Sequence, residues 1–274
     1  MHQFRIIYST MKYRLIGFYR IFSLTSFALR FFAPLLTILI AWILFTKVFG
    51  STISSFNKYS QSSDYLTFIL IGSAIYTYVY GTVFVLGRTY FWDQLLGTIE
   101  PRLMTPTSRT AYMIGVVLFG MLNATIDCLV VGVLGWLIFR VPLILYHPGL
   151  LIIGLVLLVT SMFGVGLVIN GITCTLRDRT NTANILSMIF FVFSGIIVPL
   201  GMLPGWAQSI SRLIPLTYAL QLIRLSTVPV IDVNFIISNI IILIAFSLIL
   251  TFIGVIFLNL FEHNLKKKAN LTVF

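Results

Sequence analysis

Charged residues are scarce in this 274-residue chain. They make up 9% of it, whereas an ordinary soluble domain carries about 25%. Hydrophobic residues supply 59% of the sequence, and its mean hydropathy is +1.04. A chain of this composition cannot place most of its side chains in water, so an ordinary soluble domain is excluded. We expect an all-α polytopic membrane protein.

Acidic residues are the scarcer of the two charged classes. Seven aspartates and glutamates stand against 18 lysines and arginines, which gives a net charge of +11. Such an excess indicates a nucleic-acid partner when the basic residues cluster on a soluble surface. Here they lie between apolar runs. We therefore expect no nucleic-acid partner.

The sequence also lacks the common motifs of catalysis and metal binding. No Gly-Lys pair occurs, so the chain has no Walker A loop to hold the phosphates of ATP. It has no Gly-x-Ser-x-Gly elbow and no carboxylate pair placed for acid–base work. Neither Cys128 nor Cys174 has a histidine or cysteine at ligand spacing. We expect no catalytic residue, no metal site and no enzyme in this chain.

Long apolar runs are abundant instead. A membrane-spanning helix needs about 20 mostly apolar residues, and six runs reach or approach that length. The first would recruit apolar residues at both of its ends. We predict six transmembrane helices in a single permease-like domain over 1–274, built on residues 31–46, 65–87, 110–139, 149–176, 180–211 and 233–261.

Basic residues that flank the spans predict their orientation. Cytoplasmic loops carry an excess of lysine and arginine. With the N-terminus in the cytoplasm, thirteen of the basic residues fall on the cytoplasmic side and five on the other. We expect a multi-pass protein of the plasma (cell) membrane with both termini in the cytoplasm.

The first 26 residues favour a helix at the membrane surface. Apolar residues recur there at steps of three and four, accompanied by Arg5, Lys12, Arg14 and Arg20. A basic amphipathic helix of this kind lies in the interface and contacts anionic lipid head groups. A soluble helix that packs on a partner protein is the alternative.

Three prolines interrupt the apolar sequence after the fifth span. Pro199, Pro204 and Pro215 each remove a backbone donor, so no straight helix can run through the segment. Broken backbone at membrane depth must be covered by protein or line a water-filled cavity. We predict an external re-entrant hairpin over 199–230, between spans five and six, made of two short helices at 203–211 and 216–225.

The cytoplasmic segment 88–111 mixes apolar residues with charges. Pro101 and Pro106 punctuate it, and a short helix ahead of Glu100, pressed on the membrane and open to a cytosolic partner, would satisfy this pattern. A plain connecting loop is the alternative.

Two polar residues lie inside the third predicted span. Asp127 is the acidic residue well within a span, and Asn123 precedes it by one helical turn. An ionisable group at that depth is costly unless it is paired or hydrated, which makes transport one hypothesis and proton coupling a variant of it. Hydrogen bonding between helices is the structural alternative.

Three aromatic residues recur at steps of four along the second span: Tyr76, Tyr80 and Phe84. Tyr76 falls near the middle of the span, where its hydroxyl needs a partner. The stripe predicts either a translocation surface or packing against a neighbouring span or a second copy of the chain.

Two motifs give this chain a family resemblance. The first comprises Gly97, Thr98 and Glu100, followed by Thr105, Pro106 and Arg109. The second contains Ser194-Gly195, Pro199, Leu203, Pro204, Trp206, Pro215, Tyr218 and Arg224. Their order resembles the type-2 ABC exporter permeases, the membrane subunits of one class of ATP-binding-cassette transporters. With six spans and the N-terminal helix, the resemblance covers nearly the whole chain.

The resemblance implies a half-transporter. It would pair with a second permease, identical or related, and with two separate ABC ATPase subunits that bind ATP and Mg²⁺. The segment around Glu100 would contact the ATPase, and the external hairpin would gate or shape the exit. We expect export of an apolar or amphipathic substrate, drug-like or lipid. A polysaccharide or glycolipid exporter, an ion-coupled transporter using Asp127 and a membrane scaffold are the alternatives.

Overall fold

The computed structural model describes residues 2–21, 24–43, 65–98, 108–140, 144–175, 179–229 and 232–268. Within these ranges every regular element is a helix. In chain order they are α1 (His2–Ile21), α2 (Leu24–Ile43), α4 (Tyr65–Val79), the π-helix η2 (Tyr80–Phe84), α5 (Val85–Gly87), α6 (Thr89–Leu95), α8 (Arg109–Phe139), α9 (Pro148–Thr175), α10 (Arg179–Phe193), the 3₁₀-helix η3 (Leu200–Met202), α11 (Gly205–Ser211), α12 (Pro215–Leu225) and α13 (Val233–Lys268).

Four of the six predicted spans correspond to helices that are long and apolar enough to cross a membrane. They are Tyr65–Gly87, Thr110–Ile138, Pro148–Ile172 and Val233–Leu260. The first predicted span overlaps α2. The fifth overlaps α10, whose apolar part, Ala183–Phe193, is shorter than a crossing requires. The all-helical membrane fold is therefore confirmed, and the count of six spans stays a prediction.

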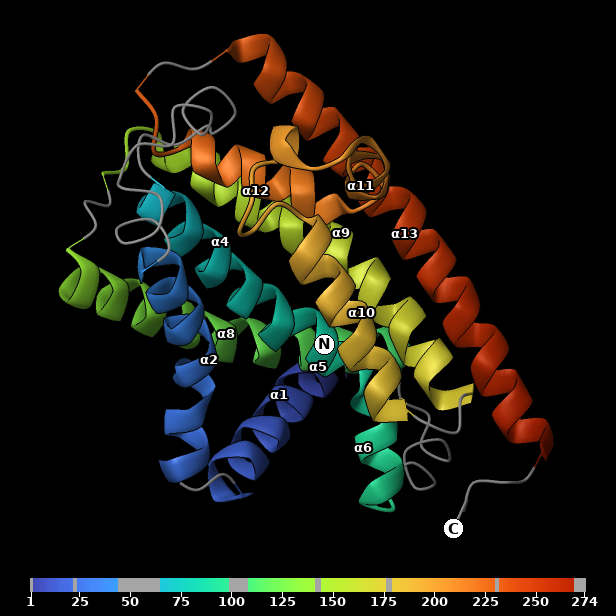
Figure 1. Ribbon diagram of the computed structural model, residues 1–274. Coiled ribbons are helices and arrows are strands. Elements are labelled where there is room, and N and C mark those ends of the chain that lie inside the picture. Colours follow the sequence, from blue (N-terminus) through green and yellow to red (C-terminus); the bar gives the residue numbers. More distant parts are fainter. Residues whose placement is uncertain are drawn as a thin grey trace.

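Small residues bring the long helices into close contact. A Cβ atom added at Gly164 of α9 would overlap the backbone of Leu250 in α13, and one added at Gly254 would lie 2.7 Å from the carbonyl oxygen of Gly164. In lipid, helices gain little from the hydrophobic effect by associating, so the van der Waals contacts of closely packed backbones hold them together. Figure 1 shows α9 and α13 running side by side over most of their length.

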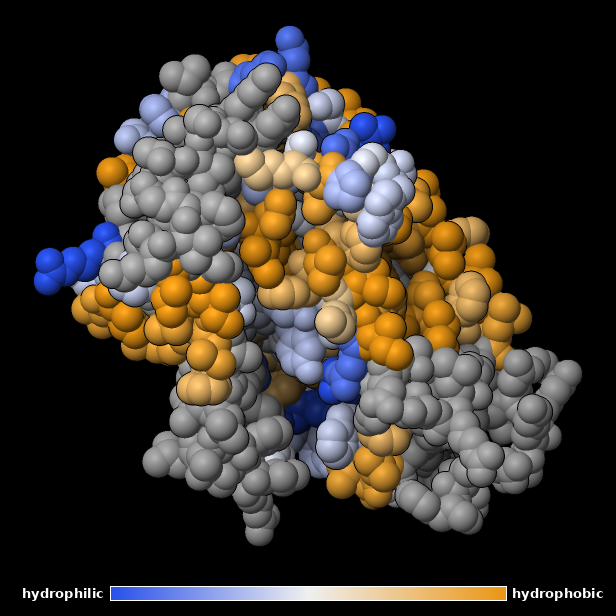
Figure 2. All heavy atoms as spheres, in the orientation of Figure 1, coloured by the Kyte–Doolittle hydropathy of each residue, from blue (hydrophilic) through white to orange (hydrophobic). Residues whose placement is uncertain are grey.

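The outer surface of the helices is apolar. Leu248 and Phe252 of α13 are 69% and 70% exposed, as expected for side chains that face lipid. Figure 2 shows hydrophobic residues over much of the visible face, and a hollow with hydrophilic residues in the area that α2 and α10 flank in Figure 1.

The N-terminal helix packs across the start of α8. At Gly115 of α8, an added Cβ would lie 2.8 Å from Thr10 Cβ and 2.9 Å from the carbonyl oxygen of Ile7. Large apolar residues on the other side of α1 stay exposed, among them Phe4 at 80%. The predicted helix within residues 1–26 is therefore present over His2–Ile21. Its position in the membrane interface stays a prediction.

Candidate functional site

The predicted coupling segment begins as a short helix, α6, that ends in a glycine turn. Gly97 has a φ of +66°, and the Thr98 amide donates to the Asp93 carbonyl at 2.8 Å. This is the bond by which a glycine in the left-handed conformation closes a helix. Of the motif residues predicted here, Gly97 and Thr98 form this turn, and Arg109 begins α8. Glu100, Thr105 and Pro106 lie outside the described residues.

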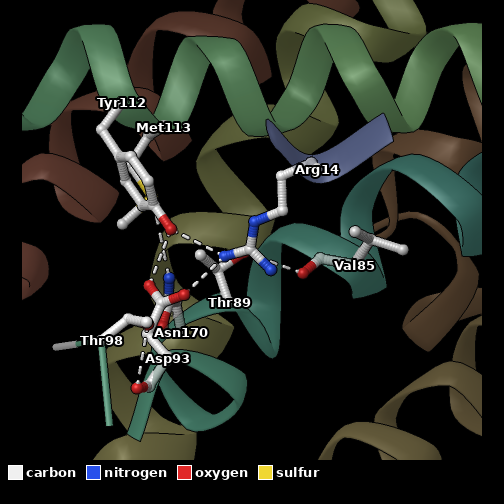
Figure 3. Close-up of polar contacts among 8 residues, drawn as sticks. All are labelled: Arg14, Val85, Thr89, Asp93, Thr98, Tyr112, Met113 and Asn170. Atoms are coloured by element: carbon white, nitrogen blue, oxygen red, sulfur yellow. Dashed lines mark hydrogen bonds and ion pairs between the residues drawn. The ribbon is translucent and has the colours of Figure 1, made fainter. Parts of the chain in front are cut away.

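Asp93 of α6 joins a polar network that the sequence did not reveal (Figure 3). Arg14 Nη2 of α1 lies 2.7 Å from Asp93 Oδ1 and donates to the hydroxyl of Tyr112, in α8, at 2.7 Å. Tyr112 in turn donates to Asp93 Oδ2 at 2.7 Å. We call these three residues the Arg14 network, and it joins α1, α6 and α8.

The Arg14 network is shielded from water. The side chains of Arg14 and Asp93 are 15% and 5% exposed. Burial by itself would lower the pKa of the Arg14 guanidinium, but Tyr112 and Asp93 outweigh it and hold that pKa above its ordinary value. Arg14 is therefore charged at every physiological pH. Such a charge-assisted pair fixes the geometry of its partners more firmly than an exposed one.

A cavity of about 530 Å³ lies between α2, α4, η2, α5, α8 and α10. Its described lining comprises Pro34, Thr37, Ser73, Tyr76, Thr77, Tyr80, Gly81, Val85, Asp127, Ser187, Met188 and Phe191. We call it the aromatic cavity. It brings together Tyr76 and Tyr80 of the predicted stripe with Asp127, which is 3% exposed. Asn123 is also buried but is absent from this lining.

Phe84 does not line the aromatic cavity. It is 1% exposed and belongs to the hydrophobic core, where its ring meets Phe190 edge-on at 6.3 Å. Residues Tyr80–Phe84 form a π-helix, which has a wider turn than the α-helix on which steps of four are counted. The rings of Tyr80 and Phe84 still lie 5.6 Å apart between centroids, so the stripe runs from the cavity wall at Tyr76 and Tyr80 into the core at Phe84.

Hydrogen bonds attach the cavity wall to α10. The hydroxyl of Tyr76 donates to the carbonyl oxygen of Ser187 at 3.2 Å. Arg88 donates to Asn184 Oδ1 at 2.9 Å and to the Tyr80 hydroxyl at 3.0 Å. The second and fifth predicted spans are therefore joined at two points, at Tyr76 in the cavity wall and at Arg88 beyond it.

The predicted hairpin consists of α11 and α12, which agree with the two short helices expected around Pro215. Pro215 is the first residue of α12, where its missing N–H is not needed. Pro204 precedes α11, and Pro199 precedes η3. The Leu203 carbonyl accepts from Gln208 at 2.9 Å.

The two aromatic residues of the hairpin motif, Trp206 and Tyr218, lie near the surface. Trp206 is 64% exposed and meets Phe193 edge-on at 5.8 Å. Tyr218 donates to the Arg212 carbonyl at 3.0 Å. These contacts are compatible with the predicted external hairpin; its depth in the membrane stays a prediction.

Arg224 anchors this hairpin in the interior. It is 4% exposed and donates to the carbonyl oxygens of Gly195 at 2.9 Å, Ile196 at 3.1 Å and Phe68 at 3.2 Å. Its guanidinium carbon also lies 3.3 Å from the centre of the Phe68 ring. We call these contacts the Arg224 cluster. The motif residue Arg224 thus connects α12 to α4 and to the turn that follows α10.

Glycines make room for the Arg224 cluster. Gly195 has a φ of +76°, which a glycine adopts without strain. At Gly72 an added Cβ would lie 2.6 Å from the Ile196 carbonyl oxygen and 2.9 Å from Arg224 Nη2. The backbone of α4 therefore approaches the turn more closely than a side chain would allow.

Comparison with known proteins agrees with the family motifs. A protein-family model described as "ABC-2 type transporter" matches residues 6–228. No curated protein matches the chain. The matched region contains the Arg14 network, the aromatic cavity and the Arg224 cluster.

Proposed function

This chain belongs to the ABC-2 type transporter family, and we propose that it exports an apolar or amphipathic substrate. Membership of this family makes the chain the membrane-spanning permease subunit of an ABC transporter. A permease of this family works with an ABC ATPase subunit. In our proposal, two separate ATPase subunits bind ATP and Mg²⁺ and hydrolyse the ATP. A second permease copy, identical or related, completes the transporter in the plasma membrane, with both termini of each permease in the cytoplasm.

The Arg14 network is the observation that best supports coupling. It attaches α6, the first part of the segment predicted to contact the ATPase, to α1 and to the start of α8. A movement of that segment is therefore passed to a long helix that lines the aromatic cavity. ATP drives the change only by its different affinity for the two states of the ATPase.

The aromatic cavity supports the proposed substrate class. Ring faces of Tyr76, Tyr80 and Phe191 offer apolar contact area, while hydroxyl groups nearby offer hydrogen bonds. Its volume of about 530 Å³ falls in the range of about 300–1,000 Å³ that holds drug-sized ligands. We rank a drug-like or lipid substrate first.

A pull-down from native membranes tests the proposal. The tagged chain is purified in mild detergent, its partners are identified and ATP hydrolysis is measured, with Glu100→Lys and Glu262→Lys in parallel. Glu262 lies near the end of α13, outside the predicted coupling segment, so it controls for the same charge change elsewhere. We expect a P-loop ATPase with the wild type and Glu262→Lys, and its loss with Glu100→Lys.

Two results would overturn the proposal. The first is recovery of the intact chain without an ATPase in several detergents. The second is an ATPase that both glutamate variants retain equally, because Glu100 would then have no part in coupling.

A further inference from the structure

Arg88 is a cation at the edge of the aromatic cavity. It donates to the hydroxyl of Tyr80, which lines the cavity, and its guanidinium carbon lies 5.5 Å from the centre of the Tyr80 ring. Val85, three positions before Arg88, lines the cavity too. The positive charge therefore borders the space in which the proposed substrate would lie.

The described partners of the Arg88 side chain are all uncharged. Its Nη2 donates to the Tyr80 hydroxyl and to the amide oxygen of Asn184, and its buried Nε meets no acceptor within the described residues. Arg14, by contrast, faces the carboxylate of Asp93 at 2.7 Å. A guanidinium with neutral partners keeps its charge and its remaining donors for a phosphate or a carboxylate, the groups that its planar fork matches.

Arg88 also lies at the end of a membrane-spanning helix. It directly follows the apolar span Tyr65–Gly87, so its charge falls near the level of lipid head groups while the cavity extends into the span. Figure 2 shows hydrophilic residues inside the hollow that α2 and α10 flank, with hydrophobic residues around it. A cation at this level beside an apolar cavity fits a molecule with a charged head and an apolar body.

The acid in the cavity lining lies deeper than Arg88. The helices α4 and α8 run in opposite directions (Figure 1), and an added Cβ at Gly81 would lie 2.9 Å from Ala124 Cβ. Asp127 is three positions further along α8, away from Arg88. At a rise of about 1.5 Å per residue, the two charges lie about 15 Å apart along the span. An acidic head group at Arg88 is therefore remote from the Asp127 carboxylate.

Aromatic rings continue from Arg88 into the cavity. The ring of Tyr80 lies 6.3 Å from that of Tyr76, which lies 4.8 Å from that of Phe191, measured between centroids. The bond from Tyr76 to the Ser187 carbonyl fixes the middle ring. These rings offer an apolar surface that begins at the guanidinium.

We propose that the aromatic cavity binds an anionic amphiphile, with its phosphate or carboxylate head at Arg88 and its apolar body against Tyr80, Tyr76 and Phe191. This assignment rests on the proposed function and narrows its substrate class. A neutral sugar could stack on the same rings, but it would make no use of the Arg88 charge. A diacyl lipid of the surrounding leaflet and a single-chain amphiphile both carry the required chemistry.

Two amphiphiles with the same chain and opposite head charge test the proposal. Radiolabelled dodecyl phosphate and dodecyltrimethylammonium are offered to the full-length chain in nanodiscs of zwitterionic lipid, and binding is measured by equilibrium dialysis against empty nanodiscs. We expect saturable binding of dodecyl phosphate alone. Arg88→Gln should weaken it at least about tenfold, the loss expected for one charge-assisted contact. Arg88→Lys keeps the charge and should weaken it less.

Lys12→Gln is the matched control for the loss of one positive charge. Lys12 is exposed on α1, between Thr10 and Arg14, and is absent from the cavity lining. Binding should therefore stay as in the wild type. Phosphatidic acid added to the nanodisc lipid distinguishes the two sources of the ligand. Competition identifies a lipid of the leaflet, and unchanged binding identifies a single-chain amphiphile; both results support an anionic site.

Equal saturable binding of both amphiphiles by the wild type would overturn the proposal, and this measurement does not depend on any variant folding. Dodecyl phosphate binding that Arg88→Gln leaves unchanged, or that Lys12→Gln weakens equally, would overturn it too, because overall charge would then explain the result. The assay requires no ATPase, so its failure is distinguishable from failure of the pull-down. An ATPase partner without anion binding would leave the permease assignment in place and remove the substrate class.

Discussion

Replacing Asp93 by asparagine should release α1 from α6 and α8. The substitution keeps the shape of the side chain but removes the charge that Arg14 faces at 2.7 Å. Removing one partner of a buried ion pair costs about 3–5 kcal/mol. The Arg14 side chain is 15% exposed, so water screens part of the interaction. We therefore expect Asp93→Asn to destabilise the attachment of α1 by about 2–3 kcal/mol. That corresponds to an increase of about 30- to 150-fold in the open population.

Hydrogen exchange measures this opening directly. The amides of α1 in the full-length protein should exchange faster by that factor in Asp93→Asn, while those of α9 and α13 keep their rates. Tyr112→Phe, which removes the bridging hydroxyl alone, should cost about 1 kcal/mol. The double variant Asp93→Asn, Arg14→Gln should lose less stability than the sum of the two single variants, because Asp93 and Arg14 share one interaction. Strict additivity, or unchanged exchange in α1, would refute the reasoning.

Two further predictions concern stability and are checked by thermal melting of the purified chain. Arg224→Met should cost about 3–5 kcal/mol, because the carbonyls of Phe68, Gly195 and Ile196 lose a common donor while buried; an unchanged melting temperature would contradict this. Gly164→Ala should cost about 1–3 kcal/mol by forcing α9 away from α13. In the matched control Gly132→Ala, the added methyl meets nothing within 4 Å, so no loss is expected there.

Sequence reasoning predicted the two short helices around Pro215 well, because proline acts locally. Pro204 and Pro215 restrict the backbone at their own positions and just before them, so the ends of α11 and α12 followed from chemistry within a few residues. The apolar spans were equally accessible, since hydropathy needs no knowledge of neighbours. Four of them are found as long apolar helices.

The Arg14 network was missed because it joins residues far apart in the sequence. The sequence pattern of the first helix predicts that Arg14 contacts lipid head groups, and the pattern of segment 88–111 does not distinguish Asp93 from its other charges. One signal was available in the sequence. Asp93 is among only seven acidic residues in a chain with 18 basic residues, so an ion pair with one of those basic residues could have been expected. Which base it meets depends on how α1 crosses α8, and this follows from packing at Gly115.

The aromatic stripe shows a different limit. A period of four places Tyr76, Tyr80 and Phe84 on one face, and their rings do follow one another at 6.3 and 5.6 Å between centroids; what the period could not show is that Phe84 ends in the core. The π-helix over Tyr80–Phe84 has no clear signature in the residues themselves. Thr82 takes part locally, since its hydroxyl donates to the carbonyls of Tyr78 and Val79, but many threonines in regular helices do the same.

The Arg224 cluster also bears on how the protein is made. Arg224 donates to a carbonyl 156 positions earlier in the chain, so the ribosome has completed α4, α8, α9 and α10 before this arginine emerges. An arginine without partners in the membrane is expensive. At the predicted membrane depth of the hairpin, insertion of α12 would be favourable only once α4 and the turn after α10 are already assembled around Gly72. We therefore expect closure of the hairpin to be a late step of biogenesis, which requires that the earlier helices have already packed together.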